Sequence, residues 1–126
     1  MATKTFEDLE VWKRGCQLAV DVCVATHHSK NFGLKDQMQR SAISVPSNIA
    51  EGAERDSDGD FIRFLRISKG SCGELRTQLY ISERVQQALD LEPFANSREM
   101  IKETREISAM LQGHIRSIEN RRPSKS

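Results

Sequence analysis

The sequence predicts an all-α protein, an up-down antiparallel four-helix bundle formed by a single domain. Its 126 residues suit one domain with one hydrophobic core. Three prolines and seven glycines are too few for the many turns of a β fold. Four segments instead have apolar residues at helical spacing, and the short connections between them make successive helices antiparallel. We expect the bundle to occupy residues 1–120 and a flexible tail to follow over residues 121–126.

The first helix is expected from about residue 8 to residue 28. Thr5 and Asp8 have the spacing of a capping box, and turn residues at 30–33 end the helix. One side of this helix carries an apolar seam that we predict to face the core. The seam consists of Leu9, Trp12, Cys16, Ala19 and Cys23.

A second apolar face lies nearly opposite that seam, and it consists of Val11, Leu18, Val22 and Ala25. At about 100° per residue, the two faces need two different packing partners. An apolar surface left in water favours association between chains. We therefore predict that these four residues form an oligomer interface. The alternative is that the first helix is simply more central in the bundle.

The second helix is expected at about 34–54. Pro46 lies inside it and removes one hydrogen bond, so we expect a kink or a division near Val45. The acidic run 56–60 suits a loop and the start of a third helix that reaches about residue 89.

Three small residues in the middle of the third helix, Gly70, Ser71 and Gly73, are expected to allow close helix packing. Pro93 then interrupts the chain. Asn96 or Ser97 can cap a fourth helix, whose apolar residues from Met100 to Ile118 share one face.

The composition limits the partners of the protein. Nineteen Lys and Arg residues against 18 Asp and Glu give a net charge of +1, so binding to nucleic acid would need a local basic patch. The sequence shows no secretion signal and no apolar run long enough for a membrane span, which predicts a cytoplasmic protein without membrane contact. An odd number of cysteines, three, predicts reduced thiols.

Two polar stripes are candidate functional surfaces. On the second helix, a stripe that includes Ser44, Asn48, Glu51 and Arg55 could be a polar network at a subunit or ligand surface, or a solvated face with one ion pair. On the third helix, basic residues could contact phosphates while Tyr80 stacks on a base; the alternative, which a nearly neutral chain favours, is a solvent face. This basic stripe consists of Arg66, Lys69, Arg76, Tyr80 and Arg84, and Arg40 of the second helix could add to it.

No pattern in the chain indicates a catalytic, cofactor-binding or metal site. The acidic loop 56–60 fails the EF-hand spacing, because Phe61 and Ile67 stand where that loop needs Gly and Glu. The histidines lack the Glu-x-x-His context of di-iron bundles. An enzyme would require Asn48 and Glu51 to line a closed pocket, and we expect a non-enzymatic protein.

Several strings are similar to a known family. DLEVWK at 8–13, SVPSNIAEG at 44–52 and FIRFL at 61–65, followed by KGS at 69–71 and EL at 74–75, resemble the bacterial proteins linked to intervening sequences in ribosomal RNA genes. The related accessory variability determinant of diversity-generating retroelements shares the pattern. The resemblance covers about residues 6–90.

The resemblance implies a four-helix bundle that assembles as a homopentamer and, for the retroelement relatives, a partnership with RNA and reverse transcriptase. This chain departs from the family where Gln39 and Arg40 replace two basic residues, which removes a charge, and where Cys72 replaces Leu. We therefore expect an oligomeric scaffold or accessory protein, with RNA or DNA binding, of the reverse-transcriptase partner type, as the alternative function.

Overall fold

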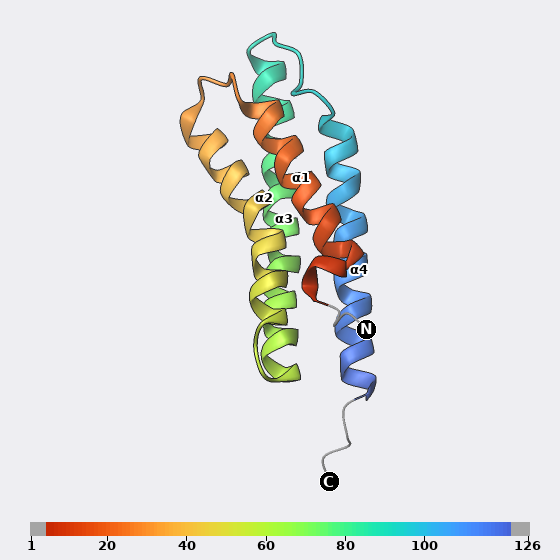
Figure 1. Cartoon of the computed structure of the whole chain (residues 1–126). Helices are drawn as coiled ribbons and strands as arrows, with labels where there is room; N and C mark the ends of the chain where they lie inside the picture. The colour runs from red at the N-terminus through yellow and green to blue at the C-terminus, as the bar shows by residue number, and fades with distance from the viewer. Residues whose placement is uncertain (1–4, 122–126) are drawn as a thin grey trace.

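The computed structural model describes residues 5–121 and consists of four long helices. The short 3-10 helix η1 (Phe6–Asp8) precedes α1 (Glu10–Thr26), α2 (Phe32–Ala53), α3 (Asp58–Ala88) and α4 (Ser97–Arg121). Successive helices run in opposite directions along one long axis (Figure 1). The described residues contain no strand, so the predicted all-α four-helix fold is confirmed. The predicted tail lies outside the described residues, except for Arg121 at the end of α4.

The four helices form a square in cross-section. Among the described elements, α1 packs against α2 and α4, and α3 packs against α2 and α4, whereas α1 and α3 lie diagonally across the core. The core follows the axis of the square. Its largest fully buried side chains include Leu18, Met38, Ile49, Leu65, Leu75, Leu79, Ile101, Ile107, Leu111 and Ile115.

Polar side chains cap the N-terminal ends of η1, α2 and α3. The predicted capping box is present, since the Thr5 backbone N–H donates to the Asp8 carboxylate at 3.1 Å, but it caps η1 rather than α1. Asn31 accepts from the Leu34 N–H at the start of α2, and Ser57 accepts from the Asp60 N–H at the start of α3. Within residues 5–121, no helix is both long and apolar enough to cross a membrane.

Helix α2 runs unbroken through Pro46, so the predicted division near Val45 is wrong, although Figure 1 shows α2 bending along its length. The Pro46 ring is buried against α1, where a Cβ added to Gly15 would lie 3.4 Å from the proline Cβ. The carbonyl of Val45 accepts a hydrogen bond from the buried Ser68 hydroxyl of α3 at 2.8 Å. The bend in α2 is therefore packed tightly by both neighbouring helices.

Helices α2 and α3 approach most closely near their connection. A Cβ added to Gly52 would lie only 2.6 Å from the Phe64 Cβ, so this position has room for glycine alone. By contrast, a Cβ added to Gly70 or Gly73 would meet no atom within 4 Å. Within a single chain, the prediction that these two glycines permit close helix packing is wrong, because they point away from the neighbouring helices.

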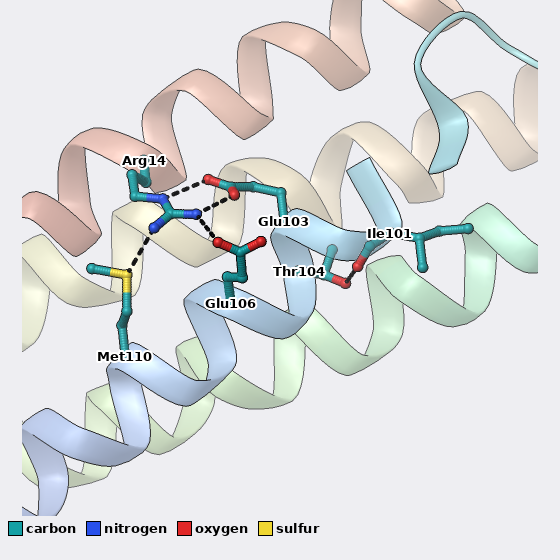
Figure 2. Close-up of polar contacts among 6 residues, drawn as sticks. All are labelled: Arg14, Ile101, Glu103, Thr104, Glu106 and Met110. Atoms are coloured by element: carbon teal, nitrogen blue, oxygen red, sulfur yellow. Dashed lines mark hydrogen bonds and ion pairs between the residues drawn. The ribbon is translucent and has the colours of Figure 1, made fainter. Parts of the chain in front are cut away.

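Helices α1 and α4 are joined by one arginine and two carboxylates. Arg14 donates hydrogen bonds to both carboxylate oxygens of Glu103, to Glu106 at 2.9 Å, and to the Met110 sulfur at 3.5 Å (Figure 2). The hydrogen bond from Arg14 lowers the pKa of Glu106 below its ordinary value of 4.5. The carboxylates of Glu103 and Glu106 in turn raise the pKa of Arg14, so Arg14 and Glu106 both stay charged over the neutral range.

The space at Gly52 predicts a large difference between two chemically identical substitutions. Gly52→Ala forces the α2 backbone away from Phe64, so the free energy of unfolding should fall by about 1–3 kcal/mol. Gly70→Ala meets no neighbour and improves helix propensity, so it should raise stability by about 0.5–1 kcal/mol. Urea unfolding measures both variants, and equal effects of the two substitutions would contradict the packing described here.

The contact between Arg14 and Glu103 predicts that Arg14→Met destabilises the bundle at pH 7 by about 1–2 kcal/mol, because charged hydrogen bonds are lost. Since the pKa of Glu106 is lowered in the folded state, its contribution is present above pH 4.5 and disappears as the pH falls through the lowered pKa. The loss of stability between pH 7 and pH 3 should therefore be smaller in Arg14→Met than in the unaltered protein.

Arg84→Met is the matched control for this pH dependence, because Arg84 is exposed and is not among the groups that shift the pKa of Glu106. Its stability should fall with pH as steeply as that of the unaltered protein. Parallel pH profiles for all three proteins would show that the contact with Arg14 does not stabilise the α1–α4 packing.

Candidate functional site

The apolar face of α1 that the sequence assigned to an oligomer interface lies in the core, together with part of the predicted seam: Ala19 is buried, and Leu9 and Trp12 pack against the core. Val11 and Val22 are fully buried and Leu18 is 1% exposed, so these three side chains belong to the core of a single chain. The prediction that they form an exposed oligomer interface is wrong. Ala25, the fourth predicted residue, is half-buried and packs against the same core.

A glycine and an arginine explain this orientation. Gly15 lies in the middle of the inner face and lets α1 approach Val45 and Pro46 of α2 closely. Arg14 lies on one flank of the same face and reaches Glu103 of α4. Trp12 lies on the other flank of this face, where it is half-buried, packs against the core, and sits edge-to-face on Phe6 at a centroid distance of 5.3 Å. The inner face therefore fits between α2 and α4.

The face of α1 that points away from the core carries two exposed valines, and we call it the outer α1 face. Val20 is 53% and Val24 is 71% exposed. Of the seam that the sequence assigned to the core, only Ala19 is buried; Leu9, Trp12, Cys16 and Cys23 are half-buried. The outer α1 face consists of Lys13, Cys16, Gln17, Val20, Cys23 and Val24.

Ile43 of α2 extends this surface. Gln39 and Pro46, which share one flank of α2 with Ile43, both contact α1: Gln39 donates to the Thr26 hydroxyl at 3.1 Å, and Pro46 packs at Gly15. Ile43 itself is exposed. The apolar surface thus continues from α1 across its border with α2.

A second apolar surface lies on α3, on the diagonally opposite helix. Ile67 is 41% and Ile81 is 46% exposed. We call this surface the outer α3 face, and it consists of Ile67, Gly70, Glu74, Thr77 and Ile81, which share one side of the helix. This face was not predicted from the sequence, because two isoleucines among glycine and polar residues give a weak periodic signal.

The polar stripe of α2 serves mainly to pack helices together. The Asn48 side-chain amide donates to the carbonyl and hydroxyl oxygens of Ser44, and the Ser44 hydroxyl lies 2.9 Å from the Ser71 hydroxyl of α3. Glu51 and Arg55 form an exposed ion pair of 3.1 Å. The Arg55 guanidinium lies over the Phe64 ring, 5.0 Å from its centroid. The stripe therefore divides into an interhelical network and a solvated ion pair.

The basic stripe of α3 lies along the border with α4, and most of its side chains have partners there. Arg66 pairs with Glu119 at 3.0 Å, Lys69 donates to Gln112 at 2.8 Å, and Arg76 donates to Thr104 at 2.9 Å. The Tyr80 hydroxyl accepts a hydrogen bond from Arg105. Arg40 pairs with Asp36 within α2, and Arg84 is exposed. These groups do not form one continuous, free basic surface.

A hollow lies where α3 ends and α4 begins, beside the connection at 89–96, and its volume is about 890 Å³. Among the charged residues that line it is Glu83, which accepts from the Ser97 hydroxyl at 2.9 Å and pairs with Arg98 at 3.0 Å. Arg98 also lies over the Tyr80 ring. These contacts join the two helix ends across the hollow.

The three cysteines are free thiols. Burial raises the pKa of Cys72 to about 11, so this thiol stays protonated in the core. Burial also raises the pKa of Cys16 on the outer α1 face. Across residues 5–121, no three side chains of His, Cys, Asp or Glu lie close enough together to hold a metal ion.

Comparison with known proteins supports one family. The chain is similar to a solved structure from Bacteroides thetaiotaomicron, a protein of unknown function from the S23 ribosomal protein family. The identity is 23%, the TM-score is 0.74, and the match covers 83% of this chain and 97% of the other; this likeness supports the fold. Comparison with curated proteins gave no match. The family model described as 23S rRNA-intervening sequence protein matches residues 7–113, so the chain belongs to that family.

Proposed function

We propose that this protein is a non-enzymatic, self-assembling helical bundle that serves as a scaffold or accessory factor. The observation that carries this proposal is the outer α1 face. Val20 and Val24 are more than half exposed on this face, and the exposed Ile43 adjoins it. An apolar surface of this kind is stabilised by contact with another protein surface. A second copy of the same chain can provide that surface.

Two further features support a structural role over a catalytic one. Asn48, which an enzyme would need in a closed pocket, holds Ser44 and so helps to pack α2 against α3. Glu51 is exposed and paired with Arg55, so it does not line such a pocket. The number of copies that we propose is five, which is the number that the family resemblance implies.

Replacing Val24 by Glu tests this function. The charge would enter an apolar contact between chains, so Val24→Glu should convert the assembly into single chains at micromolar concentration, as sedimentation velocity would show. Ala109→Glu on α4 is the control, because Ala109 is exposed on a polar surface. Ala109→Glu should sediment like the unaltered protein. Equal sedimentation of all three proteins would contradict assembly through α1.

Binding to RNA or DNA is the second candidate function. It is supported by the exposed guanidinium groups of Arg66 and Arg84 on α3, and it is weakened by the contacts that engage Arg66, Lys69, Arg76 and Tyr80 with α4. An assembly would repeat these cations around its surface, which would raise the local positive potential.

A salt titration distinguishes the two functions. If nucleic acid is bound through these cations, the logarithm of the affinity should fall linearly with the logarithm of the salt concentration. Arg66→Gln combined with Arg84→Gln should make that slope shallower by about 2, because two phosphate contacts are lost. Filter binding with a structured RNA measures the slope. No retention of RNA at 50 mM salt would rule out this second function.

A further inference from the structure

We propose that the outer α1 face of one copy binds the outer α3 face of a second copy, with Lys13 opposite Glu74. This inference rests on the proposed self-assembly and names the surface that receives α1. Both faces are exposed in a single chain, and both carry two large aliphatic side chains: Val20 and Val24 on α1, Ile67 and Ile81 on α3. Contact between the two faces would therefore bury exposed aliphatic side chains from both.

The shape of the outer α3 face suits a helix. Gly70 lies between the two isoleucines along this face, and a Cβ added there would meet no atom of residues 5–121 within 4 Å. Glycine at an exposed helix position costs about 0.5–1 kcal/mol relative to alanine, and no contact among the described residues requires it there. Close approach of a second helix backbone from outside gives the glycine a role, since small side chains let helices approach each other.

The charges on the two faces are complementary. Lys13 is exposed on the outer α1 face and has no ion pair within residues 5–121. Glu74 lies in the middle of the outer α3 face and likewise has no ion pair among these residues. Opposite charges placed this way in an interface fix its register. A lysine on one face and a glutamate on the other therefore select this pairing over contact between two identical faces.

The spacing along both helices also agrees. Val20 follows Lys13 by seven residues, and Ile67 and Ile81 each lie seven residues from Glu74. Seven residues are two helical turns, about 10.5 Å along the axis. A Lys13–Glu74 contact therefore brings Val20 opposite an isoleucine whether the two helices run parallel or antiparallel. Such a seven-residue repeat is the pattern by which helices pack side by side.

The pairing has a consequence for symmetry. The two faces lie on diagonally opposite helices, so one copy can use its α1 face and its α3 face at the same time. Contacts between two different surfaces are heterologous and propagate from copy to copy until a ring closes. The geometry therefore excludes a simple two-fold dimer and gives a ring where the rotation between copies closes, or an open filament where it does not.

Charge reversal tests the Lys13–Glu74 contact. Lys13→Glu and Glu74→Lys each place like charges together, and each should weaken assembly by about tenfold in the dissociation constant measured by sedimentation equilibrium. The double variant restores opposite charges and should recover assembly to within about threefold of the unaltered protein. A double variant that is weaker than either single variant would overturn the pairing. Circular dichroism checks that each chain is folded.

Mixing two defective chains tests the heterologous geometry. Val24→Glu damages only the α1 face and Ile81→Glu only the α3 face, so each variant alone should remain a single chain. An equal mixture should form a dimer and nothing larger, because one intact α1 face meets one intact α3 face. Continued assembly of Ile81→Glu and Ile67→Glu alone would overturn the pairing.

The same variants separate failure of this inference from failure of the proposed function. If Val24→Glu abolishes assembly and the two isoleucine variants do not, α1 is an interface but α3 is not its partner. If Val24→Glu itself leaves assembly unchanged, self-assembly through the outer α1 face is wrong, and the pairing with α3 is wrong with it.

Discussion

Helix α1 has apolar residues on two sides, and a four-helix bundle can bury only one of them. The face with Gly15 packs inward, because the glycine leaves room for Pro46 of α2 and the neighbouring Arg14 donates a hydrogen bond to Glu103 of α4. Once Val11, Leu18 and Val22 are inside, Val20 and Val24 must be outside. The position of α1 therefore determines both the core of one chain and the surface that it presents to other chains.

The string SVPSNIAEG, which carries the family resemblance most strongly, has a structural explanation. Val45 accepts from Ser68, Ser44 lies against Ser71, and Gly52 admits Phe64, so the string fixes α2 against α3. A solved relative at 23% identity has the same fold, with a TM-score of 0.74. The residues that carry the family resemblance most strongly are thus residues that pack the bundle.

The sequence predicted the helices well and the assignment of their faces less well. The periodic pattern located four helices, and helix α4, with a single apolar face, was predicted correctly. On α1 both faces have helical spacing, and what decides between them is a contact with Glu103, which lies 89 positions further along the chain. The prediction of a free basic stripe was limited in the same way, because the partners of its side chains, Glu119, Gln112 and Thr104, are all on α4. Local pattern cannot reveal such distant partners.

The most direct test of this account is the solution mass of the unaltered protein, measured by light scattering at micromolar concentration. Burial of the outer α1 face between chains predicts a mass several times the 14.3 kDa of one chain. A mass of 14.3 kDa that stays constant as the concentration rises would mean that Val20 and Val24 remain in water, and self-assembly would then be wrong.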